Sequence, residues 1–102
     1  MKIVVLAPDL MDQSRIRAAT AAHDAVFVGR PEALAAAADD SDLVIVDLSR
    51  RGVLDVLGAI GPRTIGFGSH VDHELLAAAA AAGCDEVLPR SQFFRRLPVL
   101  VA

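Results

Sequence analysis

Tryptophan and tyrosine are absent from this sequence of 102 residues, and four phenylalanines are its only large aromatic side chains. We therefore do not expect a platform of aromatic rings on which nucleic-acid bases stack. Cys84 is the single cysteine, which excludes an internal disulfide and fits a reducing compartment. No apolar run is long enough to span a bilayer, and Asp9 interrupts the N-terminal run before a signal-peptide core develops. We expect a cytoplasmic protein with no membrane partner.

The charge balance is mildly acidic, with ten basic and thirteen acidic residues and a formal net charge of -3. The pairs Arg50-Arg51 and Arg95-Arg96 are too short to form a basic stripe, so we expect no nucleic-acid partner. Hydrophobic residues make up 54% of the chain, which is enough to cover both faces of a sheet with helices. A chain of this length is expected to form one domain, residues 1–102.

Five short apolar runs predict β-strands, at residues 3–6, 25–28, 43–46, 64–67 and 86–88. The first and third runs are continuously apolar, which is typical of strands that are buried on both faces of a parallel sheet. Each run is followed by residues that end a strand, such as Pro8 after the first run and Gly29 after the second.

The segments between these runs predict helices at residues 10–22, 32–38, 53–60, 75–82 and 91–97. Asp9 or Asp12 is placed to open the first helix, Asp72 to cap the fourth and Ser91 to cap the last, which Pro98 is expected to end. Strands that alternate with helices over short connections indicate right-handed crossovers and a parallel sheet. We therefore expect a doubly wound, flavodoxin-like α/β fold with three α/β/α layers.

In such a sheet the functional crevice lies beyond the carboxyl ends of the strands. The sequence places a compact and chemically mixed set of polar residues there: Asp9, Arg30, Asp47, Ser49, Ser69, His70 and Arg90. No complete catalytic set is visible, because Ser69, His70 and Asp72 are too close in sequence to form a catalytic triad. His70 and His73 have a spacing that suits one helix face, but no third metal ligand accompanies them.

Two segments resemble the receiver domain of two-component response regulators. Residues 43–48 (Leu-Val-Ile-Val-Asp-Leu) look like the strand that carries the phospho-accepting aspartate of that family. Residues 82–88 (Ala-Gly-Cys-Asp-Glu-Val-Leu) are similar to the entry into its fifth strand. The resemblance extends from Lys2 to about Leu97. It implies the strand order 2-1-3-4-5, a signalling role, and Asp47 in the phosphoacceptor position.

The acidic residues that this resemblance leads us to expect are incomplete. Receivers carry two adjacent acidic residues after the first strand that hold Mg²⁺, but this chain has Ala7 and Pro8 there and only Asp9 follows. Mg²⁺ prefers oxygen ligands in near-octahedral geometry, so Asp9 and Asp47 form a poorer cage. We therefore expect Mg²⁺-dependent phosphorylation at Asp47 to be impaired or absent, as in atypical, or pseudo-, receivers.

Two further positions of the receiver site are also altered. The hydroxyl residue expected after the fourth strand is Ser69, or Gly68 in an alignment shifted by one residue. The lysine expected after the fifth strand is Arg90, whose planar fork differs from the point charge of lysine. Arg90 is expected to pair with Asp47 or with a bound phosphate. Asp9, Asp47, Ser69 and Arg90 are therefore the candidate site residues.

An interaction surface is expected near the C-terminal end of the chain. Residues 77–82 are six consecutive alanines, and residues 93–101 are strongly apolar. Receivers bind partners or dimerise through the fourth helix, fifth strand and fifth helix, so the resemblance implies a homodimer or another protein partner. The expected interface residues are Leu76, Ala80, Phe93, Phe94 and Leu97. The alternative is that the tail packs back across the first strand and helix.

These features favour a stand-alone, non-catalytic, atypical receiver-like domain that signals through protein–protein contact. The alternative is a flavodoxin-like module that binds a small ligand or phosphate in the same crevice. An enzyme is the third hypothesis, and the absence of a complete catalytic set argues against it.

Overall fold

The computed structural model describes all 102 residues, and it contains one five-stranded sheet. The strands are β1 (Lys2–Leu6), β2 (Asp24–Phe27), β3 (Leu43–Asp47), β4 (Arg63–Gly68) and β5 (Glu86–Pro89). Every neighbouring pair is parallel, and the order is β2-β1-β3-β4-β5. The predicted parallel sheet is confirmed, and each strand begins and ends within one residue of its predicted bounds.

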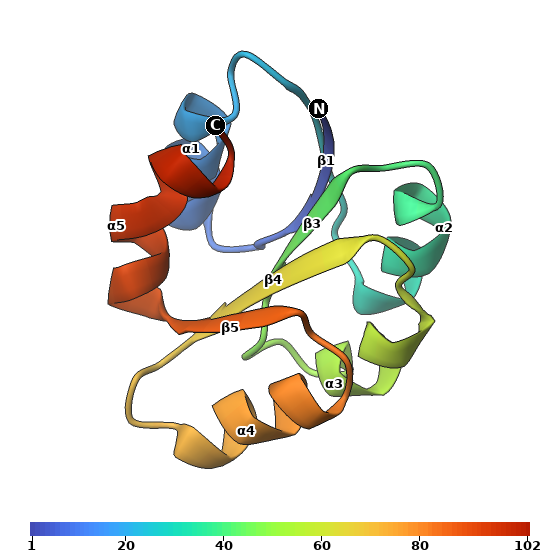
Figure 1. Cartoon of the computed structure of the whole chain (residues 1–102), viewed down its shortest axis with the longest axis vertical. Helices are drawn as coiled ribbons and strands as arrows, with labels where there is room; N and C mark the ends of the chain where they lie inside the picture. The colour runs from blue at the N-terminus through green and yellow to red at the C-terminus, as the bar shows by residue number, and fades with distance from the viewer.

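Five α-helices connect and follow the strands: α1 (Leu10–Ala19), α2 (Leu34–Ala38), α3 (Val53–Val56), α4 (His73–Ala81) and α5 (Arg90–Leu100). A 3-10 turn, η1 (Pro31–Ala33), precedes α2, and another, η2 (Leu57–Ala59), follows α3. Helices α1 and α5 lie on one face of the sheet, and α2, α3 and α4 lie on the other (Figure 1). The three-layer arrangement is therefore the predicted one. None of these helices combines the length and apolar character needed to cross a membrane.

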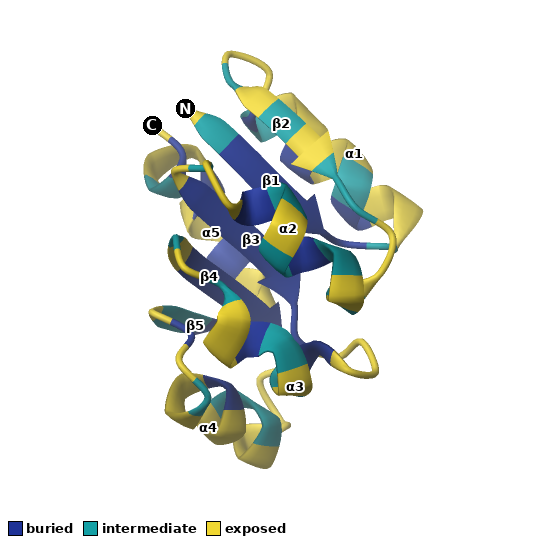
Figure 2. Ribbon diagram, turned by 90° about the vertical axis from the view of Figure 1, so that its right-hand side faces the viewer, coloured by how far each residue is buried: buried dark blue, intermediate teal, exposed yellow.

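The core is divided by the sheet into two layers because side chains along a strand point to alternate faces. Ile3 and Val5 of β1 pack with α1 and α5, whereas Val4 and Leu6 pack with the helices of the other face. Figure 2 shows the central strands buried between the two helix layers. Burial of one such side chain stabilises the fold by about 1.5–3 kcal/mol, so the strands contribute substantially to its stability.

Helix α1 begins as predicted but ends earlier than predicted. Asp9 is its N-cap, and its carboxylate accepts from the backbone N–H groups of Met11 and Asp12 at 2.9 and 3.0 Å. The prediction that the helix continues to residue 22 is wrong. Thr20 ends it, because its hydroxyl donates to the carbonyl oxygen of Ile16 at 2.7 Å and its backbone leaves the helical conformation.

Helix α5 is longer than predicted at both ends. Ser91 is not its cap, since the helix begins at Arg90 directly after Pro89, and it continues through Pro98 to Leu100. Proline removes one N–H group from the ladder, and near the end of a helix little of the ladder remains to be lost. The N–H of Val101 still donates to the carbonyl oxygen of Leu97 at 3.2 Å, and burial of the Val101 side chain holds this last turn in place.

Helix α4 has the predicted cap, but it begins at His73, two residues before the predicted start. Asp72 is its N-cap, and its carboxylate accepts from the backbone N–H of Leu75 at 3.1 Å. Gly83 follows the helix with a φ of 112°, a left-handed conformation that glycine adopts at little cost. The chain can therefore turn sharply from α4 into β5.

Candidate functional site

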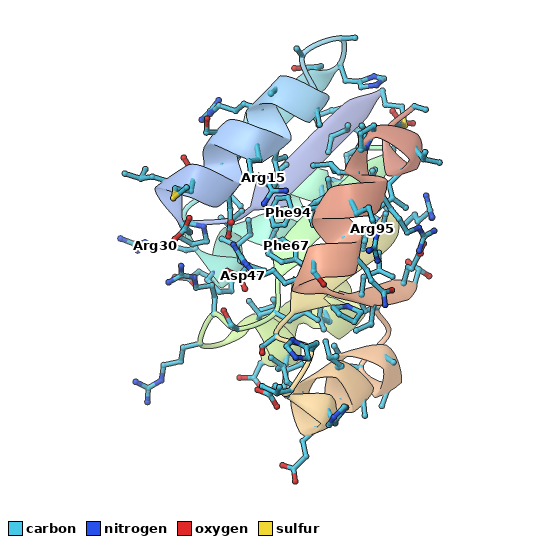
Figure 3. The ribbon with its side chains drawn as sticks, turned by 90° about the vertical axis from the view of Figure 1, so that its left-hand side faces the viewer. Arg15, Arg30, Asp47, Phe67, Phe94 and Arg95 are labelled. Carbon is cyan, nitrogen blue, oxygen red and sulfur yellow. The ribbon has the colours of Figure 1, made fainter.

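The carboxyl ends of the parallel strands meet at one edge of the sheet, where the sequence-predicted site residues lie. Asp47 ends β3, Asp9 and Ser69 follow β1 and β4, and Arg90 follows β5. Figure 3 shows Asp47 near the ring of Phe67, which points into the layer between the sheet and α5. The fold thus gathers the four candidates at one rim, but their side chains are engaged with different partners.

Asp47 is bound by its own loop. Its side chain is almost buried, with the residue 4% exposed. One carboxylate oxygen, Oδ1, accepts from the backbone N–H of Ser49 at 3.0 Å and from the hydroxyl of Ser49 at 2.7 Å. The other, Oδ2, lies 3.4 Å from Nε of Arg50 in an ion pair. Both oxygens therefore already have partners from the β3–α3 connection.

Asp12 also belongs to the site, although sequence reasoning considered it only as a helix cap. It lies on the inner side of α1, one turn before Ile16, and is 1% exposed. Its Oδ1 accepts from the guanidinium of Arg90. The expected pairing of Arg90 with Asp47 is therefore wrong, because the first turn of α1 presents a carboxylate directly to the start of α5. The i, i+4 spacing of Asp12 and Ile16 was the signal that placed this carboxylate on the buried face.

Arg90 is held on its other sides by aromatic rings and by further charge. Its guanidinium carbon lies 5.3 Å from the ring centre of Phe94 and 5.7 Å from that of Phe67. Its hydrogen bond to Asp12 raises the pKa of Arg90, and the charges of Asp12, Asp47 and Asp9 add to this effect. The guanidinium is therefore a permanent cation among three carboxylates.

Asp9 and Ser69 use their side chains for local structure. The Asp9 carboxylate accepts the first N–H groups of α1, as described above. The Ser69 hydroxyl accepts from the backbone N–H of Val71 at 3.4 Å, so it takes part in the turn that leads to α4. Asp9 is exposed, and so is Ser69.

The residues present do not fit a Mg²⁺ ion. The positions after β1 that would supply an acidic pair are Ala7 and Pro8, which have no ligand atoms in their side chains. Asp12 is bound to Arg90, and Asp47 is bound by Ser49 and Arg50. No group of three or more His, Cys, Asp or Glu side chains is arranged to hold a metal ion. In this rim the guanidinium groups of Arg50 and Arg90 supply the positive charge.

One carboxylate oxygen at the rim lacks a partner. Oδ2 of Asp12 is buried and accepts no hydrogen bond. An unpartnered buried oxygen of a charged group is costly, so the single bond from Arg90 stabilises this carboxylate almost alone. The Asp12–Arg90 pair is therefore sensitive to any change at either residue.

A pocket of about 370 Å³ adjoins the rim on the side of α3 and α4. Ser49, Arg50 and Arg51 of the β3–α3 connection line one side, and Asp72 and Leu75 at the start of α4 line the other. The lining mixes two arginines with Asp55 and Asp72, so the pocket does not present a single sign of charge.

The residues predicted to form an interface are divided by the structure. Phe93, Phe94 and Leu97 are buried against the sheet and α1, so they are not available on the surface of one copy. The tail thus packs back across the first strand and helix, which is the alternative that the sequence left open. Leu76 is half-buried and Ala80 is exposed on α4. The amphipathic pattern of the sequence could not by itself show which element would cover these apolar side chains.

Comparison with solved structures places this fold among response-regulator receivers. A response regulator from Hahella chejuensis matches with a TM-score of 0.80 and 19% identity, over 98% of this chain and 91% of that one. The receiver domain of the response regulator NarL from Mycobacterium tuberculosis matches with a TM-score of 0.79 and 13% identity, over 98% and 91%. A pilus assembly-related protein from Burkholderia pseudomallei matches with a TM-score of 0.76 and 16% identity, over 99% and 86%.

No protein-family model and no curated protein sequence matches this chain. The structural likeness nevertheless covers nearly all of it, so the chain has the fold of a receiver domain. The resemblance detected in the sequence is therefore confirmed at the level of the fold.

Proposed function

We propose that this chain is a receiver-like signalling domain that acts through protein–protein contact, without Mg²⁺-dependent phosphorylation of Asp47. The proposal rests on two observations at the rim: the Asp47 carboxylate already has partners, and the acidic pair is missing. Asp47 keeps the place at the end of β3, but Ser49 and Arg50 occupy its carboxylate, and the positions of the acidic pair are Ala7 and Pro8. Phosphoryl transfer depends on a metal ion to neutralise the charge that develops on the phosphate oxygens. A rim without that cage is poorly suited to the reaction.

A domain with the receiver fold can have a function without phosphorylation of Asp47. A folded domain with charged and apolar surfaces can recognise a partner in one fixed conformation, and no catalytic group is needed for this. We propose a non-catalytic role because Ser69, His70 and Asp72 are exposed and serve the turn into α4.

Phosphorylation can be tested by incubating the purified chain with acetyl phosphate and Mg²⁺ and measuring its intact mass. We expect no phosphoryl adduct, and the same mass spectrum for Asp47→Asn, because Asp47 lacks its metal-binding neighbours. A receiver domain that has the acidic pair serves as the positive control in the same buffer. An adduct on the natural chain that disappears in Asp47→Asn would refute the proposed lack of phosphorylation.

A second candidate function is binding of a small anionic ligand, and the pocket beside the rim is the observation that favours it. Arg50 and Arg51 are both exposed there, and Arg51 has no ion-pair partner within the chain. Thermal stabilisation by inorganic phosphate in the absence of Mg²⁺, lost in Arg51→Gln, would favour this function over the first.

A further inference from the structure

Positive charge is concentrated on one side of this acidic protein. Of its ten basic and thirteen acidic residues, α1 and α5 together hold five arginines and one aspartate. The remainder therefore holds five basic and twelve acidic residues. Helices α1 and α5 cover the same face of the sheet (Figure 1). The molecule therefore has a basic face and a strongly acidic remainder.

Three of the five arginines on this face have no carboxylate partner. Arg90 is paired with Asp12, and Arg96 is paired with Glu86. Arg15, Arg17 and Arg95 form no ion pair within the chain. Their charge is therefore available to a partner.

A groove lies between the two helices of the basic face. It has a volume of about 410 Å³, and we call it the α1–α5 groove; its lining residues are Arg15, Ala18, Ala19, Phe94, Leu97 and Pro98. Five of these six side chains are apolar. On the side of α1 the groove is lined by Ala18 and Ala19. Their side chains are small, so a partner's side chains can approach the backbone closely. Met11 and Val99 extend the apolar surface along the same helices, and they are 76% and 77% exposed.

Arg15 belongs both to the basic face and to the lining of the α1–α5 groove. Its guanidinium carbon lies 4.0 Å from the ring centre of Phe94, and Figure 3 shows it reaching from α1 toward this ring. A guanidinium that stacks on a ring keeps its N–H groups directed outward, where they can donate to a carboxylate in a forked pair. Arg95 follows Phe94 on α5 and adds a second free cation.

We propose that the α1–α5 groove binds an amphipathic helix of a partner protein, with apolar anchors on one face and carboxylates beside them. This inference rests on the proposed function, because it names the surface through which protein–protein contact takes place. A helix laid between two others presents anchors at positions i, i+3 or i+4, and i+7. Its apolar anchors contact Ala18, Ala19 and Pro98, and its acidic residues pair with Arg15 and Arg95.

The charge of the face argues against the other occupants. The same face of a second copy would bring unpaired arginines against unpaired arginines, which disfavours a symmetric dimer here. The phosphates of a nucleic acid or of an anionic membrane would form ion pairs with the arginines. They would make no favourable contact with the apolar lining of the groove. Both are also extended polyanions, and they would meet the acidic remainder of the molecule.

The probe is a synthetic helical peptide of about 18 residues, a length that can hold helical structure in water. It carries leucines at i, i+3 or i+4, and i+7, with glutamates beside them. A second peptide has lysines in place of the glutamates. Binding to the full chain is followed through backbone amide chemical shifts, which detect affinities as weak as millimolar. We expect saturable shifts at Ala18, Ala19 and Leu97 with the acidic peptide alone.

Two charge-matched double variants test the role of the arginines. Arg15→Glu/Arg95→Glu is expected to weaken binding by about tenfold or more, because two charge-assisted pairs are replaced by repulsion. Arg30→Glu/Arg63→Glu changes the net charge equally at two exposed arginines that lie outside the groove and outside the pocket beside the rim, and it should leave the affinity nearly unchanged. Ala18→Leu fills the floor without a change of charge and is expected to weaken binding as well.

Four results would overturn the proposal. They are no saturable shift up to millimolar acidic peptide, equal binding of the lysine peptide, equal loss in the two double variants, and stronger shifts of the groove residues with a DNA duplex or phosphatidylserine vesicles. The experiment does not involve Asp47. Its failure would therefore remove this docking surface, whereas failure of the phosphorylation proposal would show as a mass adduct.

Discussion

Arg90 and Asp12 differ in their exposure to water, and this difference decides what each contributes. The Asp12 side chain is 1% exposed, whereas that of Arg90 is 46% exposed and rests partly on the rings of Phe94 and Phe67. Water can therefore solvate the guanidinium if its partner is removed, but it cannot solvate the carboxylate. The pair is asymmetric, and the arginine is the residue that the fold depends on more.

Substitution of the two residues should show this asymmetry. Arg90→Gln is expected to lower the free energy of unfolding by about 1–3 kcal/mol, because a buried carboxylate loses its only partner. Asp12→Asn should cost less, since the freed guanidinium is half-exposed. The double variant should cost less than the sum of the two, and urea unfolding of all four proteins measures these differences. Equal costs for the two single variants would contradict this account.

At the scale of the elements, β4 and the connection after β3 lie close together at a glycine. Gly66 of β4 faces Leu48, and a Cβ at position 66 would lie 2.6 Å from Cδ2 and 2.8 Å from Cγ of that side chain. Leu48 is buried, so it has little room to move away. In the β3–α3 connection, which also binds Asp47, Leu48 therefore packs directly against Gly66 of the neighbouring strand.

Gly66→Ala is therefore expected to destabilise the chain by about 1–3 kcal/mol through overpacking. Gly61→Ala is the matched control, because nothing lies within 4 Å of a Cβ at position 61 and its φ is not in the left-handed region. Thermal unfolding of both variants gives the comparison. An equal effect of the two glycine substitutions would show that contact with Leu48 is not the cause. In the double variant Gly66→Ala/Leu48→Ala, the cost should be less than additive.

At the scale of the whole molecule, the two ends of the chain are joined by a histidine. Nε2 of His23 lies 2.6 Å from the carbonyl oxygen of Val101, and Nδ1 lies 3.1 Å from the N-terminal nitrogen. Because a carbonyl oxygen only accepts, Nε2 carries the proton and Nδ1 accepts from the terminus. His23 is half-buried between the termini, which lie near each other in Figure 1.

Ionisation of the Cys84 thiol makes the stability of the whole molecule depend on pH. Its thiol is buried against α4 and the sheet, and burial raises the pKa of Cys84 above its ordinary value. The thiol of the unfolded chain ionises at lower pH than that of the folded chain. Stability from this group is therefore complete below about pH 8.5 and is lost as the pH rises through the raised value.

We expect the free energy of unfolding to fall between about pH 8.5 and 10, by at most about 1.4 kcal/mol per pH unit. In Cys84→Ala this dependence should disappear, although the variant is less stable at every pH because it leaves a small cavity. Urea unfolding at several pH values measures the slope. An unchanged slope in Cys84→Ala would assign the pH dependence to another group. The limit of pH 10 avoids the titration of Lys2, whose pKa is raised by Asp40.

Sequence alone determined the features that depend on neighbouring residues. The five strands, the parallel sheet and the caps Asp9 and Asp72 follow from apolar runs and capping residues, which act over a few positions. The position of Asp47 at the end of β3 follows in the same way. The strand order came from the family resemblance, and the fold confirms it.

Tertiary structure decided the contacts between distant parts of the chain. Asp12 and Arg90 are 78 positions apart, and their pairing depends on how α1 and α5 lie on the same face of the sheet. The same packing buries Phe93 and leaves the α1–α5 groove open. The periodicity of α1 places Asp12 on the buried face, but it does not identify Arg90 as the partner, because two remote side chains meet only when the layers come together.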